Sequence, residues 1–296
     1  MTDTKPRKTY RSVSQYRQYK DCPHQYFLQR RERAWQRPAA WFPHGTAWHT
    51  AVEEWELSGR EMSLEDAQAV FRRQYAIDVT EYCQRAPNFE YWFASGPYRG
   101  EDDVNRRFDI GMDQVAKYVR YYTETAPDEV PWVTPEGKLA IELECTVDLD
   151  GVEVTGKIDG VMMVRPEVPR PRTASGKLST SKKALAEYEA AREAAVPRPR
   201  IRDGKTGQLP GDDFQLGTYD VLVLAEYGLK ADQGDYWMAK PGKPTEVYDL
   251  TEWTREAVTA EFHWLDEQIR AENWEPKPDP DKCSRCSVQT ACVFRA

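Results

Sequence analysis

Residues 201–220, IRDGKTGQLPGDDFQLGTYD, hold the pattern on which the prediction for the whole chain depends. In an extended strand successive side chains alternate between two faces, so Asp203 and Lys205 project the same way from the strand end. Gln215 and Tyr219 stand four residues apart in a segment of helical character, which places them on one helix face. Four polar groups therefore converge from a strand and the following helix. A metal ion held by carboxylate oxygens, beside a lysine and two groups that orient a phosphate, suits phosphodiester hydrolysis.

An antiparallel hairpin precedes this stretch. Residues 138–164, KLAIELECTVDLDGVEVTGKIDGVMMV, read as two strands joined at Asp150-Gly151, a strong signal for a two-residue turn. In the second strand Asp159 faces the same way as Lys157, opposite the apolar side chains. Two further strands are expected at GDYWMAK (234–240) and TEVYDL (245–250). Helices around one such sheet indicate an α/β or α+β core.

Helical periodicity dominates the rest of the chain. Helices are expected at about 44–57, 62–83, 102–125, 213–228 and 251–273. Within the first of them, His49 and Glu53 lie four residues apart and share a face. Ser63 and Asp66 form a capping-box pattern ahead of the second. We interpret 60–130 as a helical insertion that serves as a scaffold or guides substrate.

Composition indicates a single folded domain over residues 1–296. The chain is 40% apolar and 12% aromatic, which is enough to bury a proper core. Its longest apolar run is too short to cross a bilayer, and the N-terminus lacks the apolar region of a signal peptide. We therefore expect no membrane association and a cytoplasmic location. In that reducing setting the six cysteines favour metal or cluster ligation over disulfides.

The net charge of −8 argues against nonspecific nucleic-acid binding by the chain as a whole. Residues 1–40 nevertheless hold ten basic side chains against three acidic ones, which gives this segment +7 and the remainder −15. Aromatic residues are interleaved with these charges: Tyr10, Tyr16, Tyr19, Tyr26, Phe27 and Trp35. Either the rings stack on bases of single-stranded DNA, or they belong to the core while the arginines form a solvated face.

Residues 165–200 form a second basic stretch, rich in proline and alanine. PEVPRPRTASGKLSTS lacks a regular hydrophobic period, whereas KKALAEYEAAREAA has high helix propensity and little apolar face. We interpret 165–200 as a mobile basic insertion that ends in a lone exposed helix. Its SGKLST sequence is not a phosphate-binding loop, because Leu178 occupies the Ser/Thr position and Pro171 the first glycine position.

The C-terminal tail holds three cysteines in C-x2-C-x5-C spacing: Cys283, Cys286 and Cys292. Cys22, at a helix break, is the natural fourth ligand because Cys83 and Cys145 fall within predicted regular elements. Four thiolates suit an iron-sulfur cluster or a structural zinc, and the alternative is a set of free structural cysteines. Either metal group would join 1–40 with 274–296 in one cluster-binding subdomain, across a loop of about 260 residues whose closure entropy is large.

Four motifs follow one another in a specific order: G-x-x-x-H (Gly45–His49), G-x-x-D (Gly156–Asp159), D-x-K-T-G (Asp203–Gly207) and Q-x-x-x-Y (Gln215–Tyr219). Each motif alone is common, but their order and spacing resemble the RecB-type nucleases of the PD-(D/E)XK superfamily. The four cysteines resemble its iron-sulfur branch, which includes CRISPR adaptation exonucleases, the AddB nuclease domain and stand-alone phage exonucleases. This resemblance implies a restriction-endonuclease-like core, in which a mixed central sheet is flanked by helices.

The resemblance also implies roles for individual residues. Mg²⁺ or Mn²⁺ would be bound by His49, Asp159, Asp203 and the carbonyl of Gly204. Lys205 would position the attacking water and help to deprotonate it. Gln215 and Tyr219 would support the site and the substrate, and Glu53 would be an outer ligand. A 4Fe-4S cluster, or alternatively a structural Zn²⁺, would be held by Cys22, Cys283, Cys286 and Cys292.

The leading hypothesis is a metal-dependent DNA exonuclease that acts on single-stranded DNA or duplex ends in recombination, repair or phage DNA metabolism. The alternative is a noncatalytic DNA-end-binding or CRISPR adaptation module. Partners would then be DNA and recombination or CRISPR adaptation proteins. The chain departs from the family where Arg200 and Arg202 flank Ile201, which indicates either a widened DNA path or an edge strand. His24 and His44 receive no role.

Overall fold

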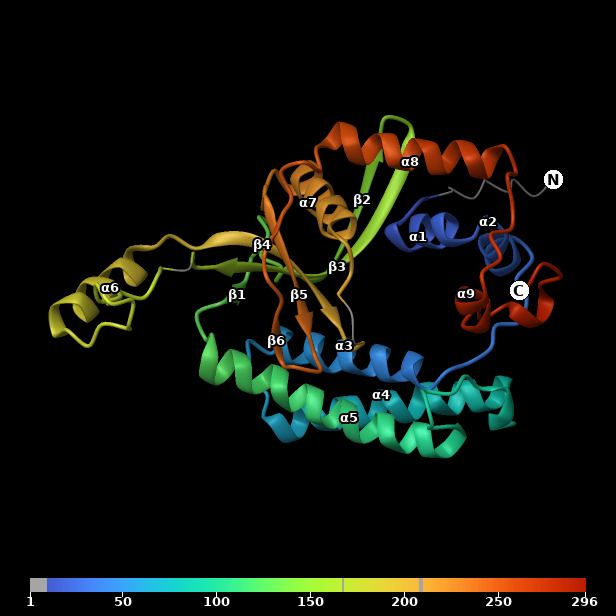
Figure 1. Cartoon of the computed structure of the whole chain (residues 1–296), viewed down its shortest axis with the longest axis horizontal. Coiled ribbons are helices and arrows are strands. Elements are labelled where there is room, and N and C mark those ends of the chain that lie inside the picture. The colour runs from blue at the N-terminus through green and yellow to red at the C-terminus, as the bar shows by residue number, and fades with distance from the viewer. Residues whose placement is uncertain (1–9, 167, 208–209) are drawn as a thin grey trace.

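A mixed sheet lies between two helical layers (Figure 1). The computed structural model describes residues 10–166, 168–207 and 210–296. The strands are β1 (Val130–Pro131), β2 (Ile141–Leu149), β3 (Val152–Val164), β4 (Arg198–Lys205), β5 (Gln233–Met238), β6 (Lys243–Pro244) and β7 (Tyr248–Asp249). The α-helices are α1 (Val13–Asp21), α2 (Pro23–Tyr26), α3 (Trp41–Leu57), α4 (Leu64–Arg85), α5 (Gly100–Arg120), α6 (Lys182–Ala194), α7 (Asp213–Tyr227), α8 (Arg255–Arg270) and α9 (Pro280–Ser284). Short π-helical turns cover Phe27–Arg31 and Tyr121–Thr125.

The predicted hairpin is confirmed as β2 and β3. Asp150 and Gly151 form the turn with φ angles of 54° and 97°, a left-handed conformation that aspartate tolerates and glycine favours. Leu149 pairs with Val152, and this tight turn fixes the register of the whole antiparallel pair.

The strand that carries Asp203 lies inside the sheet. Among the described residues the strand order is β1-β3-β4-β5-β6, with β2 also paired to β3 and β7 to β5. β4 is antiparallel to β3 and parallel to β5, so the expectation of an edge strand here is wrong. The buried guanidinium of Arg202 pairs with the buried carboxylate of Asp235 on β5, at 2.6 and 2.7 Å. Arg200 reaches the same carboxylate at 3.4 Å, so both arginines stabilise the pairing of β4 with β5.

The two faces of the sheet carry separate hydrophobic cores. α7 and α8, together with α1, cover one face around Leu222 and Phe262, and both of these side chains are fully buried. α3, α4 and α5 cover the other face around Trp48, Trp55 and Phe71 (Figure 1). Each fully buried apolar side chain contributes about 1.5–3 kcal/mol to folding. The helical segment expected at 60–130 thus packs as one layer with α3.

Helix ends follow the predicted capping signals, with one shortened helix. The Ser63 hydroxyl accepts a hydrogen bond from the Asp66 N–H at 3.1 Å and donates to Asp66 Oδ2 at 2.7 Å, which confirms the predicted helix start at Ser63. The C-terminal helix expected at 251–273 spans only α8, because the Thr254 side chain caps it by accepting from the Ala257 N–H at 3.3 Å. Among the described residues, none of the helices combines the length and apolar character that a bilayer crossing requires.

The aromatic side chains of the N-terminal segment mostly belong to the core. Tyr16, Tyr19 and Tyr26 are at most 9% exposed, so stacking on DNA bases is wrong for these three rings. Tyr10 and Trp35 are the exposed members of the set, at 52% and 43%.

The basic insertion projects from the end of β3 and β4 that is remote from Asp203 (Figure 1). All residues of α6, which lie within the described part of the chain, keep some exposure to solvent. The lone exposed helix is therefore confirmed. Arg165, next to the end of β3, holds the C-terminal end of α6 near the sheet by donating to the carbonyl of Ala195 at 2.8 Å.

Candidate active site

The candidate catalytic residues meet at a fork in the sheet. The antiparallel ladder between β3 and β4 ends where Gly160 pairs with Arg202. The next residues along the two strands are Asp159 and Asp203, at the point where the strands separate. The Gly204 N–H donates to Asp159 Oδ2 at 2.7 Å and so links the strands across the fork.

Helix α3 delivers His49 to this fork. Its Nδ1 lies 3.6 Å from Asp159 Oδ2 and 3.3 Å from Glu142 Oε1. One ligand atom from each of these three residues lies within 4.8 Å of the others. Two carboxylates and one imidazole form a donor set that fits Mg²⁺ or Mn²⁺, with the nitrogen favouring Mn²⁺.

Glu142 is the residue that the motif order missed. It lies on β2 with a φ of 48°, and its side chain is 9% exposed. Its second carboxylate oxygen pairs with Lys157 Nζ at 2.8 Å. The hairpin turn predicts this position. Because Leu149 pairs with Val152 at the turn, counting back along both strands in the same register places Glu142 opposite Asp159.

Electrostatic coupling joins the three groups. Burial disfavours a charged imidazole, but the carboxylates of Asp159 and Glu142 outweigh it and raise the pKa of His49 to about 9. Burial, followed by the negative charge of Asp203, raises the pKa of Asp159 to about 7. Burial opposes ionisation of Glu142 as well, but hydrogen bonds from His49 and Lys157 lower its pKa. These carboxylates therefore need cationic partners in order to share one site.

Asp203 lies beside this group and has its own partners. Its Oδ2 forms an ion pair with Lys205 Nζ, and its Oδ1 accepts from Gln215 Nε2 at 2.5 Å. The same Gln215 amide lies 3.1 Å from the hydroxyl of Tyr219. The structure thus brings together the four polar groups predicted from β4 and α7. Burial raises the pKa of Tyr219, so it acts as a neutral hydroxyl.

Close packing of α7 on the hairpin explains the glycine of G-x-x-D. A Cβ at Gly156 would lie 2.8 Å from Leu222 and 3.1 Å from the Tyr219 ring. Asp212 caps the helix by accepting from the Gln215 N–H at 3.2 Å. Gly156 and this cap together set how far Gln215 and Tyr219 reach toward the fork.

Glu53, the expected outer ligand, lies one helical turn beyond His49. It lines the same small pocket as His49, Glu142 and Asp159 but is outside the three-residue group. Burial raises its pKa, and the nearby Lys157 opposes that shift.

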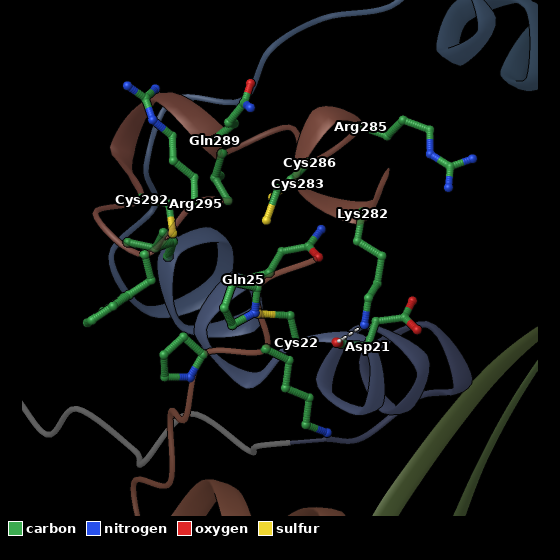
Figure 2. A pocket seen from close by; sticks show the side chains of 16 residues that line it. Asp21, Cys22, Gln25, Lys282, Cys283, Arg285, Cys286, Gln289, Cys292 and Arg295 are labelled. Atoms are coloured by element: carbon green, nitrogen blue, oxygen red, sulfur yellow. Dashed lines mark hydrogen bonds between the residues drawn. The ribbon is translucent and has the colours of Figure 1, made fainter. Parts of the chain in front are cut away.

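The four cysteines surround a second pocket, at the junction of the two ends of the chain (Figure 2). Cys22 separates α1 from α2, and the other three lie in the tail: Cys283, Cys286 and Cys292. Figure 2 also shows Lys282, whose Nζ donates to the carbonyl of Asp21 at 3.4 Å. Burial raises the pKa of Cys286, and the neighbouring thiols add to the shift.

Further contacts hold the two terminal segments together. Gln29 Nε2 donates to Ser287 Oγ at 2.6 Å, and the Arg37 N–H donates to the Ser287 carbonyl at 2.7 Å. The Tyr19 hydroxyl donates to the carbonyl of Asn273. The tail therefore packs against the segment that carries Cys22.

Comparison with known proteins agrees with this geometry. The model of the PD-(D/E)XK nuclease superfamily matches residues 10–173 and 189–293. The chain is 44% identical over 294 residues to the Gene 69 protein of Mycobacterium phage D29, which covers 96% of this chain and 97% of that protein. It is 42% identical over 323 aligned positions to the Gene 69 protein of Mycobacterium phage L5, over the full length of both.

Proposed function

The chain belongs to the PD-(D/E)XK nuclease superfamily, and on this premise we propose that it is a Mg²⁺- or Mn²⁺-dependent DNA exonuclease. The observation that carries the proposal is the group of His49, Glu142 and Asp159 beside the Asp203–Lys205 pair. Such a set places metal ligands next to a cation that can hold a nucleophile.

The residues at the fork have separable tasks in this proposal. When bound, the divalent cation supplies Lewis-acid stabilisation of the charge that develops on the phosphate, and it acidifies water. His49, Glu142 and Asp159 would hold it, and Asp203 with the Gly204 carbonyl would complete its surroundings. Lys205, fixed by Asp203, would donate a hydrogen bond to the attacking hydroxide. That oxygen forms the new bond to phosphorus while the P–O bond to the leaving sugar breaks, and the sugar alkoxide takes a proton from water.

Single-stranded DNA or duplex ends are the proposed substrate, and recombination, repair or phage DNA metabolism the proposed context. The two phage Gene 69 proteins support a phage setting. We further propose that the protein acts in the cytoplasm, where such DNA is available. The basic stretch 165–200, on an otherwise acidic chain, offers a surface for the phosphate backbone.

We propose a 4Fe-4S cluster in the cysteine pocket in preference to zinc. The four thiols line one pocket, and an all-thiolate set of this kind suits a 4Fe-4S cluster. Iron and acid-labile sulfide analysis of anaerobically purified protein tests it, and stoichiometric zinc without iron would refute it.

The nuclease proposal is tested with end-labelled single- and double-stranded DNA. Asp203→Ala and Lys205→Ala should abolish Mn²⁺-dependent cleavage, whereas Lys240→Ala, which removes an exposed lysine that follows β5, should not. Cleavage by Asp203→Ala at the wild-type rate would exclude this site. DNA binding by the wild type without any cleavage would favour the noncatalytic module.

A further inference from the structure

Arg17 reaches the candidate active site from outside the four motifs. It lies on α1, about 200 residues before Gln215 in the chain. Its Nη1 donates to Gln215 Oε1 at 2.6 Å, and its Nη2 contacts Asp212 Oδ1 at 2.5 Å. Gln215 is 6% exposed, whereas the Asp212 side chain is 56% exposed, so the contact of Arg17 with Gln215 is the more sheltered of the two.

The contact determines which way the Gln215 amide points. Its oxygen accepts from Arg17 at 2.6 Å and from Lys205 at 3.4 Å. The nitrogen therefore faces Asp203 Oδ1, to which it donates at 2.5 Å. A flipped amide would set its NH₂ group against two cations and its oxygen against a carboxylate. Arg17 is the closer of the two cations and fixes the amide most strongly.

α1 is itself anchored at its far end by the cysteine pocket. Cys22 follows the helix directly, and Lys277 Nζ donates to the Lys20 carbonyl at 3.0 Å. Next to Arg17, the buried Tyr16 ring packs on Phe214 of α7 with centroids 4.3 Å apart. The helix thus spans from the cysteine pocket to the fork.

We propose that Arg17 is a positioning residue of the nuclease site, which holds Gln215 against Asp203, and that the cysteine pocket fixes Arg17 through α1. This inference rests on the proposed nuclease function. It adds a residue that no catalytic motif contains, and it gives the cysteine pocket a consequence for catalysis as well as for stability.

The test compares Arg17→Ala and Arg17→Lys with Arg31→Ala, an exposed arginine of the same segment whose contact with Glu272 is 3.9 Å long. Arg17→Ala should lower kcat about 30- to 100-fold while KM for DNA stays within about threefold, because misplacing a catalytic group by about 1 Å costs about 100-fold. Arg17→Lys should have a kcat between those of Arg17→Ala and the wild type, because one ammonium group does not replace the planar guanidinium group. Arg31→Ala should match the wild type.

Two readouts separate positioning from folding. Free guanidinium ion at about 20 mM should raise the kcat of Arg17→Ala at least about fivefold, because it can occupy the place of the deleted guanidinium group. It should leave the kcat of Arg31→Ala unchanged. Mn²⁺ affinity, measured by electron paramagnetic resonance, should change less than about threefold in Arg17→Ala, since the side chain of Arg17 bonds to Gln215 and Asp212 and these are not members of the three-residue ligand group. Cys22→Ser should lower kcat in the wild-type background but add little to Arg17→Ala, as expected for coupled sites.

An Arg17→Ala enzyme with wild-type kcat overturns the proposal, as does a loss that guanidinium fails to restore. Additive effects of Cys22→Ser and Arg17→Ala overturn the link through α1. Wild type and Asp203→Ala are measured in the same assay. If the wild type does not cleave DNA, the nuclease function fails and the proposal falls with it. If only Asp203→Ala is inactive, Arg17 alone has been misassigned.

Discussion

Replacing Gly204 by alanine should push α3 away from β4 and take His49 with it. A Cβ built on Gly204 would lie 2.5 Å from Trp48 Cζ3 and 3.3 Å from His49 Cε1. Ordinary contact begins at 3.4 Å, so the indole must retreat by about 0.9 Å. Trp48 is 1% exposed and packs edge-on against Tyr118, so the ring has no free space to enter and the helix must move instead.

The size of the effect follows from that displacement. Overpacking of this kind costs about 1–3 kcal/mol of the free energy of unfolding. A shift of His49 by about 1 Å relative to Asp159 should lower kcat on the order of 100-fold. Stability and activity should therefore fall together, with activity falling further.

The assay pairs urea unfolding with DNA cleavage for Gly204→Ala and Gly207→Ala. Gly207 is the matched control because no described atom lies within 4 Å of its Cβ position. Its alanine variant should retain wild-type stability and kcat. If Gly204→Ala behaves like Gly207→Ala in both measurements, the close approach of α3 to β4 is refuted.

Three further predictions concern the metal ligands, a buried histidine and the cysteines. Glu142→Gln should weaken Mn²⁺ binding on the order of tenfold or more in a calorimetric titration, whereas Glu144→Gln, exposed on the same strand, should not. Burial, followed by the charge of Arg107, lowers the pKa of His44 to about 4. As pH falls, His44 is protonated in the unfolded chain before it is protonated in the folded one. The free energy of unfolding of the wild type should therefore fall by about 3 kcal/mol from pH 6.5 to pH 4 and stay level above pH 6.5. Urea unfolding should show this fall in the wild type and not in His44→Asn. Cys22→Ala should lower the free energy of unfolding by up to about 5 kcal/mol in the loop-closure model, so that the melting temperature falls and protease reaches the tail. Cys83→Ala should do neither. Equal behaviour of the two variants would contradict a role of Cys22 in joining the termini.

Local signals were sufficient to predict much of the fold. The hairpin turn, the capping box and the four-residue spacings each depend on neighbours in the chain, and they locate β2, β3, α4 and α7 correctly. The register of the hairpin also contained Glu142, because a two-residue turn assigns every partner along both strands. The four motifs do not contain Glu142, because each motif follows the order of the sequence, whereas Glu142 meets Asp159 across the turn.

Long-range compensation was not predictable in the same way. Arg202 reads as an exposed cation, yet it is buried because Asp235 pairs with it from the parallel strand 33 residues later. Tyr16 reads equally well as a stacking ring or as a core residue, and contacts with Phe214 and Phe262 decide for the core. Arg17 likewise gains its meaning only from Gln215. Each case depends on a partner that no local pattern specifies.

Charge balance at the fork explains how an acidic chain can keep three carboxylates close together. Lys157 pairs with Glu142, His49 lies between Glu142 and Asp159, and Lys205 pairs with Asp203, so each carboxylate has at least one cationic neighbour. A divalent cation bound by His49 would displace the imidazole proton, and the site would gain one positive charge. Phosphate attraction at the fork would then depend on the metal, whereas the net charge of −8 would discourage DNA binding over most of the remaining surface. The affinity of the protein for DNA should accordingly depend on the divalent metal more strongly than on the bulk charge of the chain.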